Sequence, residues 1–179
     1  MATEWIDIAD TAVKIGLGAL ISGVSTYKVS SLNHKKEVEK ALIEKKINIL
    51  EEISESAETY FYFCTSLYNG VGGMQRNAKN VGAQLTEPQR KKLADKHLRL
   101  EEALEHRNKA ISKIKILSIP EAEKALMDHN KVLSAFRSLV VFDRTMPTAE
   151  FLEESREQYL LHKDKFYSAL SAYMAKVGT

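Results

Sequence analysis

The amino-acid sequence predicts an all-α protein, in which a hydrophobic N-terminal helix within residues 1–36 precedes an antiparallel bundle of about four helices in residues 37–179. Apolar residues recur at steps of three and four over most of the chain, as they do on one face of a helix. Eight Gly and three Pro are too few for an all-β fold with many turns. With 44% hydrophobic and 28% charged residues, the composition is that of a globular protein.

The N-terminal segment has the features of a membrane span. Between Thr11 and Tyr27 the only charged side chain is Lys14. It lies near one end of the segment, four residues after Asp10, so that the two charges can pair on a helix. As a helix, the segment from Trp5 to Tyr27 rises about 33 Å, which matches the hydrocarbon thickness of a bilayer. The aromatic residues at its two ends suit the membrane–water interfaces.

The flanking charges predict the orientation of this span. Acidic residues precede it, and Lys28, Lys35 and Lys36 follow it. Because Lys and Arg are retained on the cytoplasmic side, we expect a single pass of the inner (cytoplasmic) membrane with the C-terminal domain in the cytoplasm. Acidic residues before the apolar run argue against a secretory signal. In the alternative, residues 9–30 pack inside a soluble, cytoplasmic oligomer.

Small residues form a stripe along the same segment at steps of three and four. Such stripes let helix backbones approach closely, which is how helices associate in lipid. The sequence therefore predicts a homo-oligomer in a bilayer, joined through the N-terminal helix. The residues expected to mediate this helix–helix association are Ala9, Ala12, Gly16, Ala19, Gly23 and Thr26.

Residues 37–67 predict the first helix of the bundle. Two neighbouring apolar stripes give it a wide face, suited to a bundle core rather than to a two-stranded seam. No Pro or Gly occurs in residues 28–37, so this helix can continue the N-terminal one. Three Gly within Gly70–Gly73 favour a turn or hinge after it. The two stripes are Leu42, Ile49, Ile53, Tyr60, Phe63 and Leu67, and Ile43, Ile47, Leu50, Ala57, Phe61 and Cys64.

Three further helices follow, with the short connections that are typical of antiparallel neighbours. Thr86 as N-cap, Pro88 in the first turn and Gln89 as the partner in a capping box predict a helix start. This helix should end near residue 117, before Pro120, which opens the next one. A break at residues 143–147 ends that helix, and Thr148 can cap the last.

Charge is spread unevenly over the chain. Residues 69–118 hold 11 basic and 5 acidic side chains, whereas residues 1–68 hold 7 basic and 10 acidic ones. A local positive excess can attract an anionic partner, although Glu101, Glu102 and Glu105 interrupt it on the same helix and also suit a solvated face. The candidate patch for an anionic partner is Arg90, Lys91, Lys92, Lys96 and Arg99.

The sequence contains no motif for a known metal or cofactor site, and we expect neither. No Glu precedes a His by three residues, as a di-iron bundle requires. His-Glu-x-x-His, a phosphate-binding Gly-Lys-Ser/Thr loop and Gly-x-Gly-x-x-Gly after a strand are also absent from the sequence. Cys64 is the only cysteine, which excludes a disulfide within the chain and a thiolate zinc site and favours a reducing compartment.

One enzymatic pattern occurs three times. Five residues separate Arg156 from His162, and six separate both Arg99 from His106 and Arg90 from His97. A helical bundle with this Arg–His spacing resembles the HEPN ribonucleases, and the resemblance implies that His moves a proton while Arg holds an RNA phosphate. The residue after each Arg is Glu157, Leu100 or Lys91, whereas that family usually has Asn, Asp or His there. We therefore assign no catalytic residue.

These observations favour a membrane-anchored helical-bundle protein that acts by oligomerisation and protein–protein interaction, as a scaffold, adaptor or membrane effector of bacterial type. Its partners would be further copies of the chain, the lipid bilayer and an unidentified protein. One alternative is a soluble helical protein that binds nucleic acid or cleaves RNA. A second is a pore former in which Asp10 and Lys14 line a lumen.

Overall fold

The computed structural model describes the backbone of residues 2–76 and 82–177. Side chains are described from residue 33 onward within these ranges, together with those of Thr26, Tyr27 and Ser30. The elements are α1 (Ala2–Gln75), α2 (Glu87–Leu117), α3 (Pro120–Arg137), the π-helical turn η1 (Ser138–Phe142) and α4 (Ala149–Val177). The expected all-α fold is confirmed for the described residues.

The chain divides into two compact units, Met1–Lys45 and Lys46–Thr179. The described backbone of the first unit is helical and belongs to α1. Its side chains from residue 33 to residue 42 are all exposed to solvent. Leu42, which we expected on the core face, is 53% exposed, because the core stripe of α1 becomes buried only from Leu50 onward.

Most of the predicted membrane span lies outside the residues whose side chains are described. Of the stripe expected to join copies, Ala9, Ala12, Gly16, Ala19 and Gly23 lie outside that set, and Thr26 is exposed. Among the residues that could be assessed, no helix has a stretch both long and apolar enough to cross a membrane.

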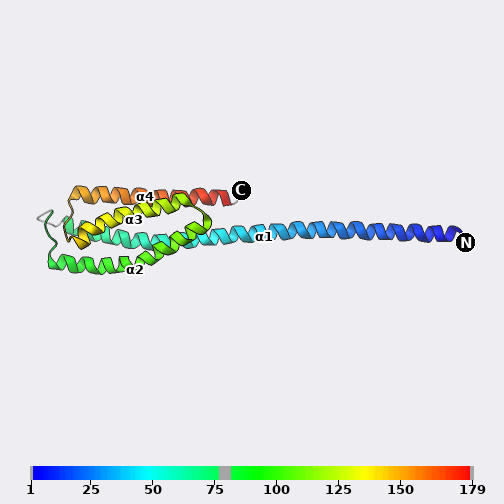
Figure 1. Cartoon of the computed structure of the whole chain (residues 1–179), viewed down its shortest axis with the longest axis horizontal. Coiled ribbons are helices and arrows are strands. Elements are labelled where there is room, and N and C mark those ends of the chain that lie inside the picture. The colour runs from blue at the N-terminus through cyan, green and yellow to red at the C-terminus, as the bar shows by residue number, and fades with distance from the viewer. Residues whose placement is uncertain (1, 77–81, 178–179) are drawn as a thin grey trace. The chain divides into compact units, whose positions relative to one another are not determined.

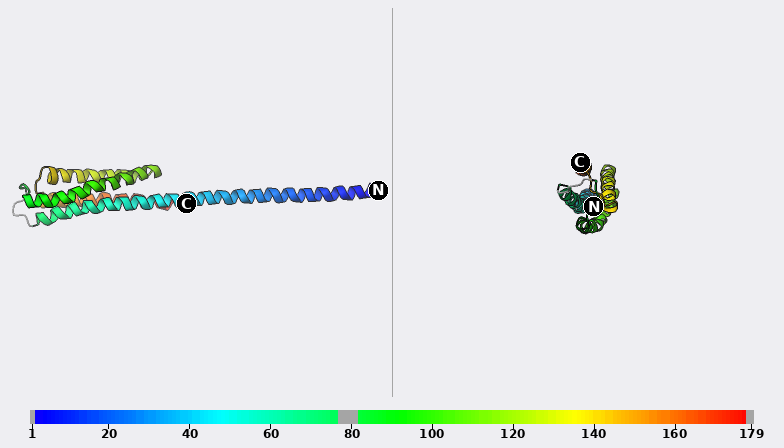
Figure 2. Two further views of the ribbon diagram at one scale, coloured as in Figure 1. Left: turned by 90° about the horizontal axis from the view of Figure 1, so that it is seen from below. Right: turned by 90° about the vertical axis from the view of Figure 1, so that its left-hand side faces the viewer.

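In the second unit, the part of α1 from Lys46 onward forms a bundle with α2, α3 and α4 (Figure 1). Each helix runs antiparallel to the one before it, and the connections lie alternately at the two ends of the bundle (Figure 2). The expected antiparallel arrangement is therefore confirmed. Short connections enforce it, since a two-residue link cannot return the chain to the far end of a helix.

Aromatic rings from three helices meet in the middle of the bundle. Phe61 of α1 is fully buried, and its ring centroid lies 4.8 Å from that of His129 of α3 and 5.6 Å from that of Phe166 of α4. The Tyr159 hydroxyl of α4 donates to the backbone carbonyl of Phe61 at 3.0 Å and lies 2.6 Å from the Thr65 hydroxyl. These contacts join α1, α3 and α4 through one apolar core.

The helix boundaries follow the chemistry of the capping residues. The Thr86 N–H donates to the Gln89 side-chain oxygen at 2.9 Å, which confirms the capping box. The Phe151 N–H donates to the Thr148 hydroxyl at 3.1 Å, which caps α4 as expected. At the end of α2, Ser118 adopts φ +54°, and its N–H bonds to the Lys115 carbonyl at 3.1 Å.

The expected turn at Gly70–Gly73 is wrong, because α1 continues through these residues to Gln75. The helix persists because tertiary packing covers this part of it: Val71 is fully buried and Met74 is 8% exposed. A Cβ on Gly70 would lie 2.7 Å from Cδ of Lys96, so the missing side chain makes room for that lysine on α2. Packing thus outweighs the cost of about 1 kcal/mol for each helical Gly.

Candidate functional site: a groove between α2 and η1

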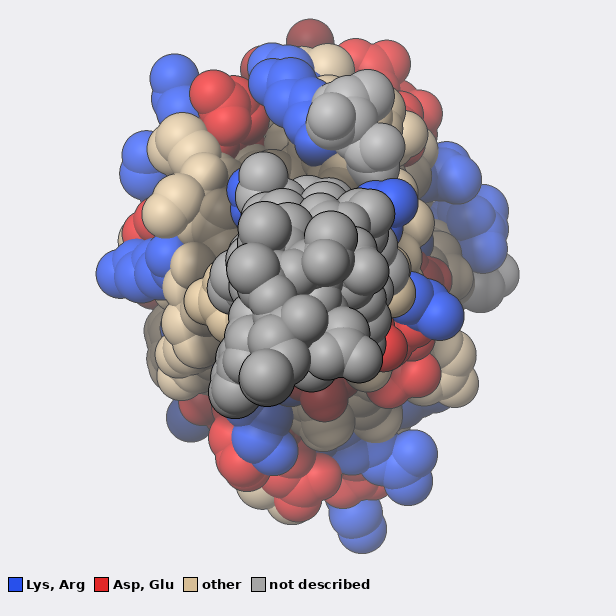
Figure 3. Space-filling view, turned by 90° about the vertical axis from the view of Figure 1, so that its right-hand side faces the viewer, with Lys and Arg blue, Asp and Glu red and all other residues tan. Residues whose placement is uncertain are grey.

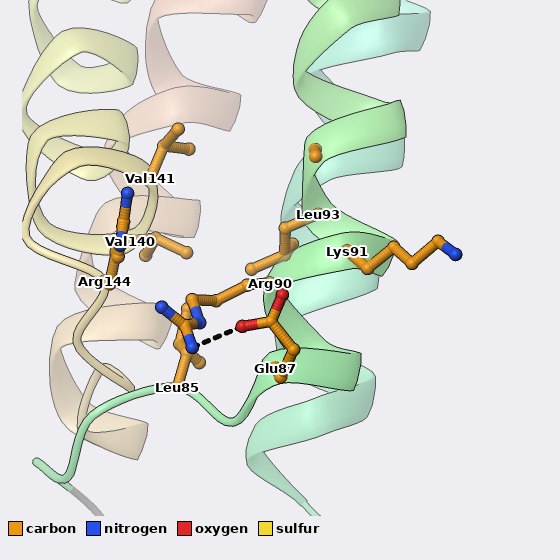
Figure 4. Close-up of a pocket in the computed structure, with 9 residues that line it drawn as sticks. Leu85, Glu87, Arg90, Lys91, Leu93, Val140, Val141 and Arg144 are labelled. Atoms are coloured by element: carbon orange, nitrogen blue, oxygen red, sulfur yellow. Dashed lines mark ion pairs between the residues drawn. The ribbon is translucent and has the colours of Figure 1, made fainter.

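A pocket of about 360 Å³ lies between the first turns of α2 and the η1 turn (Figure 4). Apolar side chains from both elements line it, among them Leu93 and Val140, which are almost fully buried. Three cationic side chains and one acidic one complete the lining: Arg90, Lys91, Arg144 and Glu87. An apolar site with a few charged groups has the general character of a ligand pocket.

Backbone hydrogen bonds hold the two sides of the pocket together. The segment before α2 pairs with the segment after η1, with Gln84 opposite Thr145 in an antiparallel bridge. The Leu85 N–H donates to the Arg144 carbonyl at 2.7 Å, and the Gly82 N–H donates to that of Met146 at 3.1 Å. Arg144, 59 residues after Leu85 in the sequence, is thereby fixed beside the start of α2.

Arg90 extends from α2 toward the side of the pocket that carries Val140 and Arg144, whereas the Lys91 ammonium points away (Figure 4). The Arg90 guanidinium forms an ion pair with Glu87, one turn earlier on α2. The Nε of Arg90 is buried without a hydrogen-bond partner. The ion pair therefore leaves a buried donor of Arg90 unused, which is costly unless an acceptor reaches it.

A second polar cluster continues the groove one turn further along α2. His97 Nε2 lies 2.8 Å from a guanidinium nitrogen of Arg137 of α3 and 3.3 Å from the Glu101 carboxylate. Arg137 also pairs with Glu101, and its Nε is buried without a partner. Burial, reinforced by the adjacent Arg137 charge, lowers the pKa of His97, so this histidine is neutral at pH 7.

An exposed aromatic ring borders this second cluster. Phe142, the last residue of η1, is 64% exposed, and its ring centroid lies 5.9 Å from that of His97 and 5.9 Å from the Arg137 guanidinium carbon. Residues 94, 97 and 101 follow one another at helical steps, so the pocket and this cluster share one face of α2. We call this surface the α2–η1 groove; it comprises the pocket lining together with His97, Glu101, Arg137 and Phe142.

The structure divides the predicted anionic-partner patch. Arg90 and Lys91 line the pocket. Lys96 faces α1 instead, where its ammonium donates to the Ser66 hydroxyl at 2.9 Å. Lys92 and Arg99 are exposed and outside the pocket lining. One helix cannot present five nearly consecutive residues on one face, because successive residues are rotated by about 100°.

Sequence reasoning missed Arg137 and Arg144 as residues of this groove. Arg137 lies inside the predicted helix, whereas Arg144 lies beyond its expected end at residue 143, so helical periodicity does not relate the two. Nothing in the sequence pattern pointed to the pairing of residues 82–85 with 144–146, which places Arg144 in the same pocket lining as Arg90.

The three Arg–His spacings lie in different surroundings. On α4, Arg156 is exposed, and Nδ1 of the half-buried His162 has no hydrogen-bond partner. On α2, His97 is engaged with Arg137 of α3 rather than with Arg90, which pairs with Glu87. The other pair on α2 comprises an exposed arginine and a half-buried histidine, Arg99 and His106.

The charged surface mixes both signs. In the end view of Figure 3, Lys and Arg side chains alternate with Asp and Glu around the rim. Three further ion pairs join helices in the described part of the chain: Lys113 of α2 with Glu52 of α1 at 2.6 Å, Lys115 of α2 with Glu123 of α3 at 3.4 Å, and Lys163 of α4 with Glu58 of α1 at 3.3 Å. Among the residues whose side chains the structure describes, no three His, Cys, Asp or Glu are grouped so that they could hold a metal ion.

Compared with protein-family models, with curated proteins and with solved structures, the chain matches none.

Proposed function

We propose that this protein acts by assembly: the N-terminal part of α1 joins copies of the chain, and the bundle presents binding surfaces to a partner. The observation behind the proposal is the exposure of apolar side chains on α1 before the bundle. Tyr27 is 75% exposed, Val38 is 55% exposed and Leu42 is 53% exposed. No side chain from residue 33 to residue 42 is buried within the chain.

An isolated helix of this length is unfavourable in water, since most helical stability in proteins comes from packing an apolar face. Val38 and Leu42 are four residues apart and so lie on the same face, with the i,i+4 ion pair of Lys40 and Glu44 away from it. A neighbouring copy supplies the missing cover. The stripe of small residues that the sequence predicts before this segment would continue the contact between copies toward the N-terminus.

The bundle offers an apolar surface for a protein partner. A groove of about 450 Å³ between α1 and α4 is lined mainly by apolar side chains, including Ile47, Leu50 and Met174. Met174 is 45% exposed, so the groove is open to solvent. Such a groove suits the apolar face of a helix from the protein partner.

Membrane anchoring by residues 5–28 is part of this proposal. It predicts that the protein stays with the membrane fraction after carbonate extraction, with the bundle accessible from the cytoplasm. Release into the soluble fraction contradicts the anchor. It leaves the assembly proposal standing, because copies can also associate through α1 in water.

Cysteine cross-linking tests the assembly directly, because the native thiol does not interfere. Cys64 is fully buried, and burial raises the pKa of its thiol to about 12. Copies anchored in one bilayer run parallel, so identical positions on the contact face meet. We expect Leu42→Cys to form disulfide-linked dimers under mild oxidation, measured by non-reducing electrophoresis.

Lys40→Cys is the matched control, because residue 40 is rotated by about 200° from residue 42 on the helix. It should cross-link far less than Leu42→Cys at equal protein concentration. Equal cross-linking of both variants, or a monomeric mass for the full chain in detergent and in buffer, would contradict the proposal.

A further inference from the structure

We propose that the α2–η1 groove binds a nucleoside phosphate, with the phosphate on Arg90 and Arg144 and the base against Phe142. Three features of the groove support this inference: guanidinium groups with N–H donors that lack a hydrogen-bond partner, apolar walls and an exposed aromatic ring. None of them depends on the association of α1, so the inference is independent of the proposed assembly.

The charges of the groove favour an anion. Arg90, Arg137 and Arg144 contribute three guanidinium groups to it, whereas its acidic side chains, Glu87 and Glu101, are each already paired with an arginine. Guanidinium groups suit phosphate because they offer several donors in a planar fork. The buried and unpartnered Nε atoms of Arg90 and Arg137 show that the internal ion pairs leave donor capacity unused.

The walls of the pocket strengthen such an interaction. Leu85, Leu93 and Val140 are at most 4% exposed and line the pocket together with Arg90, whose Nε is itself buried. A charge-assisted hydrogen bond gains strength where water is excluded. The volume of about 360 Å³ falls within the range of small-molecule sites, so the pocket can take a phosphate together with part of its sugar.

The exposed ring explains why the ligand should carry a base. Phe142 is 64% exposed although it belongs to η1, in which Val140 is buried. His97 and Arg137 contact this ring within 6 Å and lie on the same groove as the arginine pocket. Stacking of a base on an aromatic side chain beside cationic groups is the usual mode of sequence-independent nucleotide binding.

Arg144 allows a clean test, because its backbone has a matched counterpart. Arg144 and Ser118 each come after the end of a helical segment, and both have a positive φ, +56° and +54° respectively. This region of backbone conformation favours Gly. Changing either residue to Gly should therefore relieve backbone strain and stabilise the protein. Only Arg144→Gly also removes a guanidinium from the groove, and Ser118 lies outside it.

The experiment measures binding of the full chain to three probes at low salt: AMP, a single-stranded 12-nucleotide RNA and inorganic phosphate. We expect wild type to bind AMP or the RNA, and Arg144→Gly to weaken that binding at least tenfold, which corresponds to about 1.4 kcal/mol or more. Ser118→Gly should bind as wild type does. Phe142→Ala should weaken binding of AMP and RNA but leave phosphate binding unchanged.

The two sources of a nucleoside phosphate are distinguished by the probes. Similar affinity for AMP and for RNA assigns the groove to a free nucleotide. Preference for RNA, with an affinity that falls steeply with salt, assigns it to a nucleic-acid strand. Binding of phosphate as tightly as AMP, no binding of either nucleotide probe, or unchanged binding by Arg144→Gly overturns the proposal. So does binding to anionic vesicles alone, which would indicate lipid headgroups.

Discussion

A histidine in the centre of the bundle shows how one residue links burial to pH. His129 is fully buried, and neither of its ring nitrogens has a hydrogen-bond partner. Its neighbours are aromatic: the ring centroids of Phe61 and Tyr159 lie 4.8 Å and 4.7 Å away. Burial, reinforced by nearby positive charges, lowers the pKa of His129 to about 3, so the residue is neutral in the folded protein.

The lowered pKa predicts a loss of stability in mild acid. In the unfolded chain the histidine titrates near its ordinary pKa of 6.5. Below that pH only the unfolded state takes up this proton, so the free energy of unfolding falls as pH falls, by about 1.4 kcal/mol per unit. We expect His129→Leu to remove about 1.6 kcal/mol of the loss between pH 6.5 and pH 5, measured by urea denaturation.

A half-buried histidine on the surface, His106, serves as the control for this prediction. His106 lies on α2 and is only half-buried, so solvent reaches its side chain in the folded protein. His106→Gln should therefore leave the pH dependence of wild type intact. A His129→Leu variant with the pH dependence of wild type would show that the buried imidazole is protonated in the folded state.

A second residue-scale feature is the hydrogen-bonded group around Asn130. The side-chain oxygen of Asn130 accepts from Arg107 of α2 and from the Tyr60 hydroxyl of α1, the latter at 3.4 Å. Tyr60 is fully buried, and burial raises the pKa of its hydroxyl. This one amide therefore joins three helices through polar contacts next to the aromatic core.

At the scale of the element, α1 shows that packing can override a glycine-rich sequence. The helix passes through Gly70, Gly72 and Gly73 because its other side chains there are buried in the bundle. The three positions differ in the space around them: Lys96 covers Gly70, Leu152 approaches Gly72, and a Cβ on Gly73 would meet no atom within 4 Å.

These surroundings predict different responses to alanine. Gly73→Ala should raise the free energy of unfolding by about 1 kcal/mol, because Ala has the higher helix propensity and meets no obstacle. Gly70→Ala should gain less or lose stability, because the Cβ would lie 2.7 Å from Cδ of Lys96 and displace its bond to Ser66. Thermal unfolding of the two variants measures the difference, and an equal gain in both would refute the close approach of Lys96.

At the scale of the whole molecule, one aromatic cluster joins α1, α3 and α4, whereas the ion pairs on the surface of the bundle add little. Phe61 contacts rings from α3 and α4 and carries the Lys163 ammonium at 5.2 Å from its centroid. Removing its side chain leaves a cavity that the antiparallel helices cannot close without losing their other contacts.

Phe61→Ala should therefore cost about 3–5 kcal/mol of unfolding free energy, in the range of large-to-small core substitutions. Phe142→Ala should cost less than about 0.5 kcal/mol, because that ring is largely in water. Urea denaturation of both variants provides the measurement. A similar cost for the two would contradict the assignment of Phe61 to the core and of Phe142 to the surface.

Much of the helical architecture was predictable from local patterns. Apolar periodicity, the Thr86–Gln89 capping box and the position of Pro120 depend on residues a few positions apart, whose relation is set by helix geometry alone. They placed three helix boundaries correctly. The turn expected at Gly70–Gly73 was wrong because tertiary burial of Val71 and Met74 compensates the propensity of glycine.

The groove depended on relations between distant residues. Arg90 and Lys91 were expected to serve an anionic partner, but Arg144 joins them only because the segment before α2 pairs with the segment after η1. Arg137 belongs to the groove because α3 packs beside α2, where its guanidinium meets His97. Lys96 lies apart from the rest of the expected patch, because its position on the helix directs it toward Ser66 of α1. Short-range spacing determines which residues form a helix and share its face, whereas the packing of faces against one another decides which charges meet. That packing is a sum of many weak contacts over the whole chain, and no local pattern records it.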